Sequence, residues 1–437
     1  MRKSFGALLL VSLASACLSA CGGEPESPAD GQSAVGFVFV GTNHNNTHDA
    51  GEPANQVTVY RRFADGSLEL ADHVDTGGQG SGPSARFAGD GLGSSHSMVL
   101  SQDRAFLLVT NAGSDTLSAL RVRKDTLEVT DVQPTSDGAG PGFPNSVTQH
   151  GDLVYALNGA GEGSVTGFRL SDEGKLTPIP GSTRLLSANQ ASPPDTLFNP
   201  AQASFTPDGR QLVVTIKDGP AAGLIGGVTP TGPSRVLVFD VLDDGQLAQT
   251  FTQTELDNDG PFGFSFDAAG HLLTAMFVGG DDLAGAAGSF QINADGTLTP
   301  ITRNAKVSQL DPCWLENNGE FAFTANYTSG TLSSFRIGDD GSLTVLDEQA
   351  GLTDERAGTA GASQQGSTPL DLGISPDGRF LYDVLPGSGK VGAWRIEDDG
   401  GLTKIGEYGG LPRTVDGDRA PEERFGPGGS PAGIGVL

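Results

Sequence analysis

Acidic residues followed by glycine recur along this 437-residue chain, and carboxylates at such spacing could bind calcium or exchange protons. The segments are FADGSLEL, LSDEGKLTP, VLDDGQLAQ, NADGTLTP, IGDDGSLTVL and IEDDGGLTK. An EF-hand calcium loop needs D-x-[DN]-x-[DN]-G with a glutamate six residues after the glycine, and none of these segments has that pattern. Each lies between runs of alternating apolar and polar residues, where Asp-Gly is typical of a tight hairpin turn. We therefore interpret them as corners of a fold.

Two other groups of residues could do chemistry. His44 and His48 have a spacing that suits zinc on a helix, but HNNTHDAGEP is a loop sequence. Cys313 alone of the three cysteines belongs to the predicted folded domain, so neither an intrachain disulfide nor a cysteine-rich metal cluster is expected. It is either a small buried apolar side chain or a nucleophile, and no base lies near it in sequence. The sequence predicts no metal ion and no cofactor.

A four-strand pattern recurs seven times and must position any site. The innermost strands begin at Ser95, Pro144, Pro200, Pro261, Asp311, Pro369 and Pro431. The second strands are FVFVGT, AFLLVTN, DLVYALN, QLVVTIK, HLLTAMF, EFAFTAN and RFLYDVL. Four-stranded antiparallel units repeated in this way build a β-propeller, which protects its sheet edges by radial repetition. We predict an all-β, seven-bladed propeller over residues 36–437.

The two ends of the chain supply complementary halves of one blade. PAGIGV near the C-terminus has no strands after it, and GFVFVGT near the N-terminus has no innermost strand before it. We expect the C-terminal and N-terminal strands to pair, because this closes the ring and removes two free sheet edges. We expect the protein to be a monomer.

Loop length distinguishes the two faces of the predicted ring. Connections from first to second and from third to fourth strands are short glycine turns, whereas the others include NHNNTHDAGEPAN and KDGPAAGLIGGVTPTGPS. Binding residues concentrate on long loops held by a rigid scaffold, so we place the site on the long-loop face, at the axis. The polar side chains nearest the axis there are His96, Asn111, Asn145, Asn158, Gln202, Lys217, Asp311, Trp314, Asn326 and Asp371.

Each of these residues has a structural alternative. An asparagine after a strand often caps a turn, and a tryptophan on an innermost strand is either core or a stacking platform. Lys217 interrupts an apolar strand ahead of a Gly-Pro loop, which leaves a structural or a ligand-facing role open. Arg86, Arg356 and Arg424 lie in long loops of the same face.

Residues 1–20 are predicted to be a lipoprotein signal peptide. Arg2 and Lys3 precede the apolar stretch FGALLLVSLASACLSAC, which is shorter than the roughly 20 residues of a membrane span. Leu18-Ser19-Ala20-Cys21 resembles the bacterial lipobox, whose cysteine is acylated; alternatives are a lipobox ending at Cys17 and an ordinary secretory signal. Residues 21–35 are expected to be a flexible tether. We therefore predict a protein anchored by lipid at Cys21 in the bacterial cell envelope, in the outer membrane, the periplasm or at the cell surface.

The formal net charge of −27 limits the partners of the domain. Phosphates of nucleic acid would be repelled, and so would anionic lipid at the domain surface. We expect no nucleic-acid partner, and contact with the membrane only through the lipid anchor.

The chain after the tether resembles the lactonase family of seven-bladed propellers, which includes 6-phosphogluconolactonases and carboxymuconate cyclases. The resemblance rests on FTPDGRQLVV, PFGFSF, CWLENNGEFAFTANYTSGTLSSFRIGDDGSLTVL and SPDGRFLYDVLPGSGKVGAWRIEDDGGLTKI. It implies opening of a lactone ring by water, or the reverse closure. A sugar phosphate is not expected as the substrate, because such metabolites are cytosolic and the chain is predicted to be exported.

The resemblance also implies roles for individual residues. His96 would be the general base, with Asp371 or Asp311 orienting or replacing it, and Lys217 and Arg86 would stabilise the oxyanion. Asn111, Asn145, Asn158 and Gln202 would hold substrate hydroxyls. The competing hypothesis is a non-catalytic envelope propeller that binds a glycan, a peptide or a surface protein, which a funnel rich in Asn and Gln also fits.

Overall fold

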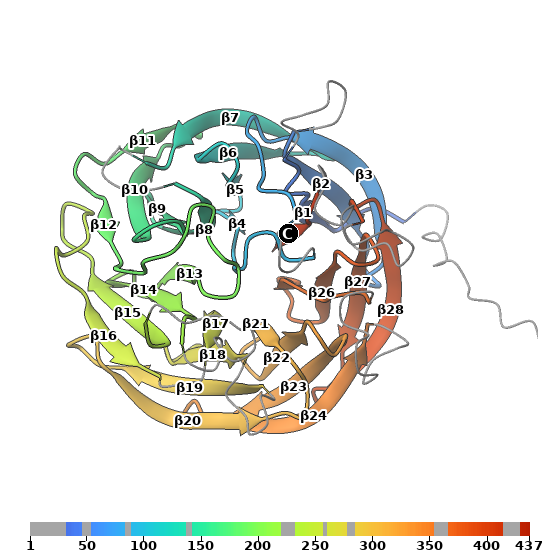
Figure 1. Cartoon of the computed structure of the whole chain (residues 1–437). Coiled ribbons are helices and arrows are strands. Elements are labelled where there is room, and N and C mark those ends of the chain that lie inside the picture. The colour runs from blue at the N-terminus through green and yellow to red at the C-terminus, as the bar shows by residue number, and fades with distance from the viewer. Residues whose placement is uncertain are drawn as a thin grey trace, which may run out of the picture.

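The computed structural model describes residues 32–45, 54–83, 89–136, 142–219, 232–256, 260–277, 285–353, 366–413 and 429–437. Their strands form seven antiparallel sheets, arranged as blades around a central axis (Figure 1). The all-β, seven-bladed fold predicted from the repeats is confirmed. No helix within the described ranges combines the length and the hydropathy of a membrane span. Cys21, His48, Arg86, Arg356 and Arg424 lie outside the described residues.

We number the blades in chain order, and in each blade the strands run from the axis outward. Blade 1 consists of β29 (Ala432–Val436), β1 (Gly36–Gly41), β2 (Gln56–Arg62) and β3 (Leu68–Asp75), and blade 2 of β4 (Met98–Leu100), β5 (Phe106–Asn111), β6 (Thr116–Arg123) and β7 (Thr126–Pro134). Blade 3 consists of β8 (Pro144–His150), β9 (Leu153–Asn158), β10 (Ser164–Leu170), β11 (Leu176–Pro178) and β12 (Arg184–Leu185). Its outer strand is thus divided, since β11 and β12 both pair with β10.

The remaining blades each have four strands. Blade 4 consists of β13 (Pro200–Phe205), β14 (Gln211–Ile216), β15 (Arg235–Asp240) and β16 (Thr252–Glu255), and blade 5 of β17 (Pro261–Phe266), β18 (Leu272–Met276), β19 (Ala286–Ile292) and β20 (Leu298–Lys306). Blade 6 consists of β21 (Pro312–Asn317), β22 (Phe321–Asn326), β23 (Thr331–Ile337) and β24 (Leu343–Leu352), and blade 7 of β25 (Leu372–Ile374), β26 (Phe380–Leu385), β27 (Lys390–Ile396) and β28 (Leu402–Gly409).

The ring closes by pairing its two ends. β29 is antiparallel to β1, with Val38 opposite Val436 and Val40 opposite Ile434. Phe37 and the C-terminal Leu437 exchange backbone hydrogen bonds of 2.9 and 2.8 Å. The predicted closure is therefore confirmed, and it leaves neither β29 nor β1 as a free edge.

The acidic-glycine segments are hairpin corners, as the sequence predicts. Gly66 and Gly341 have φ values of +87° and +79°, a region that favours glycine. The preceding aspartates brace these turns, because a side-chain oxygen of Asp65 accepts a hydrogen bond from the backbone N–H of Ser67 at 3.0 Å. Their carboxylates are thus engaged with their own turns.

The core lies between neighbouring blades. One buried cluster joins Leu157 and Val165 of blade 3 to Val214 and Leu237 of blade 4. Each such side chain stabilises the fold by about 1.5–3 kcal/mol through removal of apolar surface from water. The second strands β5, β22 and β26 are buried along their whole length, and this packing gives a rigid ring that can hold side chains at the axis.

Bulges set the direction of side chains on the innermost strands. The ladder of β21 with β22 shifts between Pro312, which lies opposite Asn326, and Trp314, which lies opposite Ala325. Cys313 is therefore the extra residue of a bulge, and Pro312, which has no N–H to donate, tolerates the first position of the strand. Comparable shifts occur next to Pro144, Pro200 and Pro261.

Candidate functional site

A pocket of ≈ 400 Å³, counting its mouth, lies where blades 4, 5 and 6 meet the axis. Most of its walls come from starts of innermost strands and from residues that follow second strands, which places it on the long-loop face. Its lining residues are Asp90, Thr196, Leu197, Lys217, Phe262, Phe277, Asp311, Cys313, Trp314 and Tyr327. The structure thus brings together Lys217, Asp311 and Trp314 of the residues predicted from sequence.

Lys217 is the cation of this pocket. It follows β14 directly and is only 1% exposed. Its ammonium donates a hydrogen bond to the carbonyl oxygen of Gly93 and lies 4.1 Å from the ring centroid of Phe262. Burial lowers the pKa of Lys217 to about 8, although the Asp90 carboxylate opposes this shift. The side chain can therefore carry a desolvated positive charge at neutral pH and lose it just above.

Two carboxyl groups face the same pocket. Asp90 accepts a 2.7 Å hydrogen bond from the N–H of Gly93, and burial raises its pKa while Lys217 holds it down. Asp311 precedes β21 with φ of +55°, and the hydroxyl of Thr328 donates to its Oδ2. Burial raises the pKa of Asp311, opposed by that hydrogen bond. Among the described residues nothing donates to Oδ1 of Asp311, and the residue is half-buried.

Aromatic rings form much of the wall. The ring of Trp314 lies 4.9 Å from that of Phe262 and 6.4 Å from that of Tyr327, between centroids. Burial raises the pKa of the Tyr327 phenol well above its ordinary value, so the phenol stays protonated. Cys313 lines the pocket, but burial also raises its pKa well above the ordinary value. A nucleophilic cysteine needs a lowered pKa, so the geometry favours the interpretation of Cys313 as a small buried side chain.

Residues 90–97, which we call the axial strap, contribute Asp90 to the lining of the pocket. The strap precedes β4 of blade 2, yet it is bonded to blades on both sides of the axis. The Ser94 hydroxyl donates to the carbonyl of Asn145 in blade 3 at 2.6 Å, and the indole N–H of Trp314 in blade 6 donates to the carbonyl of Ser94 at 3.0 Å. The strap therefore crosses the ring.

Further bonds fix both ends of the strap. The backbone N–H of Gly91 donates to the hydroxyl of Ser430, just before β29, at 2.8 Å. At the other end the backbone N–H of Ser95 donates to the carbonyl of Ala201 in blade 4 at 3.0 Å. Because the strap has partners in several blades, the whole ring fixes the positions of Asp90 and of the Gly93 carbonyl beside Lys217.

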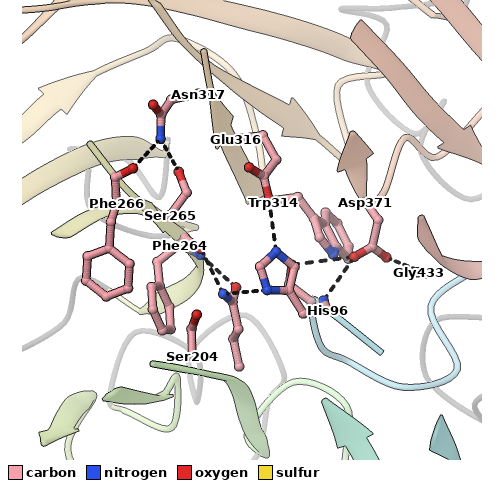
Figure 2. A network of polar contacts seen from close by, with 12 residues as sticks. His96, Ser204, Phe264, Ser265, Phe266, Trp314, Glu316, Asn317, Asp371 and Gly433 are labelled. Carbon is pink, nitrogen blue, oxygen red and sulfur yellow. Dashed lines mark hydrogen bonds and ion pairs between the residues drawn. The ribbon is translucent and has the colours of Figure 1, made fainter. Parts of the chain in front are cut away.

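His96 lies on the strap but does not line the pocket. Its Nε2 is 2.9 Å from Oε1 of Glu316 on β21, and its Nδ1 is 3.1 Å from Nε2 of Gln202 on β13 (Figure 2). The imidazole is 24% exposed, and φ of His96 is +57°. The ring thus joins blade 4 to blade 6 across the axis.

The amide of Gln202 determines which proton His96 carries. Its Oε1 accepts from the N–H of Phe264 at 2.8 Å, and its Nε2 donates to the carbonyl of Phe264 at 2.8 Å. Because Nε2 must therefore donate, Nδ1 of His96 accepts, and the proton of the neutral ring lies on Nε2 and points to Glu316. Burial by itself lowers the pKa of His96. The carboxylates of Glu316 and Asp371 together raise this pKa by more than burial lowers it, so the net shift is upward.

Asp371 does not contact the imidazole. Its carboxylate accepts hydrogen bonds from the backbone N–H of His96 at 3.3 Å and from the N–H of Gly433 at 2.9 Å (Figure 2). Burial raises the pKa of Asp371 to about 6, opposed by these contacts. The expectation that Asp371 or Asp311 orients the ring is therefore corrected, since Glu316 and Gln202 contact the ring instead.

The asparagines serve the fold. Asn111, Asn158 and Asn326 are fully buried at the ends of second strands, and each donates from Nδ2 to a serine hydroxyl of the next strand, at 2.8, 3.2 and 2.8 Å. Asn145 is also buried and donates to the carbonyl of Pro200 at 2.8 Å. None of the four lines the pocket. Their expected ligand-facing position is corrected, because the amides complete hydrogen bonds inside and between blades. Gln202 is likewise engaged, with Phe264 and His96.

Sequence reasoning missed Asp90, Tyr327 and Glu316. Asp90 stands in FAGDGLGSS, which resembles an ordinary turn, and its role depends on the path of the strap. Tyr327 follows β22 just as Lys217 follows β14, so a comparison of this position among the repeats could have identified Tyr327 as a residue of the pocket. Over the described ranges, no three His, Cys, Asp or Glu side chains gather in the manner of a metal site.

Comparison with known proteins agrees with this architecture. The model of the family described as "Lactonase, 7-bladed beta-propeller" matches residues 31–279 and 222–419. A periplasmic gluconolactonase of Pseudomonas aeruginosa superposes with a TM-score of 0.62 at 16% identity, over 92% of this chain and 99% of that chain. A Bacteroides fragilis protein provisionally named a 6-phosphogluconolactonase gives 0.60 at 15% identity, over 94% and 99%. A Lactobacillus plantarum protein gives 0.62 at 17% identity, over 92% and 99%.

These structural similarities, at such low identity, show the fold alone. No curated protein matches the chain by sequence.

Proposed function

Because the chain belongs to the family of lactonase seven-bladed β-propellers, we propose that it hydrolyses a lactone in the pocket that Lys217 and Asp311 line. The observation that carries this proposal is the placement of a desolvated ammonium and a partly engaged carboxyl in one pocket at the axis. Ester hydrolysis needs a base for water and a positive group for the oxyanion, and these two side chains supply both.

In this mechanism the Asp311 carboxylate removes a proton from a water molecule as the oxygen attacks the lactone carbonyl carbon. The carbonyl oxygen becomes an oxyanion that the ammonium of Lys217 stabilises. The ring C–O bond then breaks, and the proton held by Asp311 passes to the departing alkoxide, giving a hydroxy acid. The raised pKa of Asp311 suits this exchange, because a base is most effective when its pKa approaches the working pH.

His96 has a different role in this proposal. Both of its ring nitrogens are engaged with Glu316 and Gln202, and the ring does not line the pocket. We therefore assign it as a positioning residue that fixes the strap, in place of the general-base role implied by the family resemblance. Arg86, the other predicted cation, lies outside the described residues.

The test is turnover of a panel of γ- and δ-lactones by the purified protein, followed by acid release. We expect Asp311→Asn to lower kcat/KM by about 10²–10⁴-fold, the usual contribution of a general base. Asp339→Asn, in an exposed turn of blade 6, is the matched control and should match the wild type. Turnover that survives in Asp311→Asn, or a wild type that turns over no lactone and instead retains a glycan or peptide, would contradict the proposal.

We also propose that the protein acts in the cell envelope, held by lipid on Cys21. The signal sequence and lipobox support this location, and a propeller of the same fold is periplasmic in Pseudomonas aeruginosa. Mass spectrometry of the mature N-terminal peptide should find a diacylated or triacylated Cys21, and Cys21→Ser should move the protein to the soluble fraction. An N-terminus that begins elsewhere and carries no lipid would contradict this location.

A further inference from the structure

We infer that the substrate is an uncharged lactone that carries an apolar alkyl or aryl group, and is neither a sugar lactone nor a phosphorylated one. This inference rests on the proposed lactone hydrolysis and adds the class of substrate. Three features of the pocket support it: the nature of its walls, its charge, and the state of its polar groups.

The walls are predominantly apolar. Phe262, Phe277, Trp314 and Tyr327 present rings to the pocket, and Leu197 adds an aliphatic side chain. Such walls contribute binding energy in proportion to the apolar area that a ligand buries. A polyhydroxylated ring has little such area to offer.

The charge of the pocket disfavours anions. Phosphate sites in proteins gather arginine, lysine or backbone N–H donors, often two or more at once. Among the described lining residues Lys217 is the one cation, and it stands beside Asp90 and shares the pocket with Asp311. The net charge of −27 over the whole chain would also repel an approaching dianion.

The polar groups of the pocket are already bonded within the protein. Lys217 donates to Gly93, Asp90 accepts from Gly93, and Oδ2 of Asp311 accepts from Thr328. Thr196 and Tyr327 also have partners. A sugar lactone would bring several hydroxyl groups into this site with few groups to receive them, and each unpaired buried hydroxyl weakens binding.

Three lactones separate the possibilities: γ-decanolactone is neutral and apolar, glucono-δ-lactone is neutral and polar, and 6-phosphoglucono-δ-lactone is anionic. We expect kcat/KM to be highest for γ-decanolactone, lower by about tenfold or more for gluconolactone, and lowest for the phosphorylated lactone. Equal or faster turnover of either sugar lactone would overturn the inference.

The variant Asp90→Asn tests the charge argument. The new amide oxygen can still accept from Gly93, while one negative charge beside Lys217 is removed. We expect the preference for γ-decanolactone over the phosphorylated lactone to fall by about tenfold, since a buried unit charge acts strongly on a dianion nearby. Asp398→Asn, in an exposed turn of blade 7, removes the same charge far from the pocket and should leave the preference unchanged. An unchanged preference in Asp90→Asn would overturn the charge argument.

A binding measurement remains valid if Asp90→Asn does not fold, and it separates this inference from the proposed function. Trp314 lines the pocket, so 3-hexylcyclopentanone, the analogue of γ-decanolactone that cannot be hydrolysed, should change the tryptophan fluorescence of the wild type at lower concentration than gluconate or 6-phosphogluconate. Turnover with the reverse preference would overturn only the substrate class. Absence of turnover for every lactone, together with binding of the ketone, would overturn the hydrolysis and retain the ligand class. Absence of both would overturn both.

Discussion

Ionisable side chains lie on both sides of the axial strap, but those on one side have few hydrogen-bond partners and those on the other are fully engaged. Toward the pocket, Lys217 is buried and Asp311 is half-buried, each with few partners, and desolvation disfavours the charged form of each. Toward the inner strands, His96 is held by Glu316 and Gln202, and the Gln202 amide is itself held at both atoms. Fully bonded polar networks stiffen a structure, whereas buried charges with incomplete partners are poised for reaction. We therefore assign the chemical step to the pocket side of the strap, and we assign to the side with His96 the role of holding the strap in place.

After Asp311→Asn, the largest effect should come from Lys217→Met, which keeps most of the length of the side chain and removes its charge. We expect kcat/KM for a neutral lactone to fall by about 10²–10³-fold, as when an oxyanion donor is lost. Because the variant also frees the protein from burying a charge, the midpoint of thermal unfolding should stay level or rise. Undiminished turnover would show that Lys217 does not stabilise the oxyanion, and the functional difference between the two sides of the strap would no longer hold.

The pH dependence of kcat/KM should be bell-shaped. Burial raises the pKa of Asp311, so the acidic limb should lie above the ordinary carboxyl range near 3.9. The ammonium of Lys217 has a pKa of about 8, so activity should decline above that pH. A profile that rises with pH beyond 9 would indicate that neutral Lys217 acts as a base, contrary to its assigned role.

A smaller effect is expected on the supporting side, from His96→Asn. Asparagine tolerates the positive φ of this position, so the variant removes the ring contacts with little added backbone strain. The free energy of unfolding should fall by about 1–3 kcal/mol, because Glu316 and Gln202 lose a partner. We expect kcat/KM to fall by no more than about tenfold with an unchanged pH profile. A shifted acidic limb would reveal His96 as the base.

The smallest effect should come from Glu316→Gln, and its sign depends on pH. The pKa of His96 is raised, so the charged pair with Glu316 stabilises the fold below the unfolded value of about 6.5 and is lost as pH rises through the folded pKa. Chemical denaturation should therefore show a larger cost of the variant at pH 5 than at pH 8, where the neutral ring can still donate to the amide oxygen. Equal costs at both values would contradict this account of the pair.

The repeats made the fold predictable, because turn glycines, apolar strands and split terminal strands recur in the linear sequence. Lys217 and Asp311, which were selected by their places next to strand ends, both line the pocket. The asparagines at equivalent places were not separable from them by sequence. Asn111 and Lys217 both follow an apolar strand, and only the threonine and serine partners across the blade show that Asn111 is structural.

The strap could not be predicted, for a physical reason. Its course depends on bonds to residues such as Asn145 and Trp314, which lie far away in the chain. The separation of His96 from Lys217 follows from that course. No local pattern in FAGDGLGSSHS indicates that one end of the segment faces a pocket and the other a closed network.

The most direct test of this account is a crystal structure of the protein soaked with 3-hexylcyclopentanone, which resembles γ-decanolactone but has CH2 in place of the ring oxygen. We predict density for the ligand between Asp311 and Trp314, with its carbonyl oxygen directed at the ammonium of Lys217. Density beside His96 and Glu316 instead, with the pocket unchanged, would contradict the assignment of chemistry to the long-loop side of the strap.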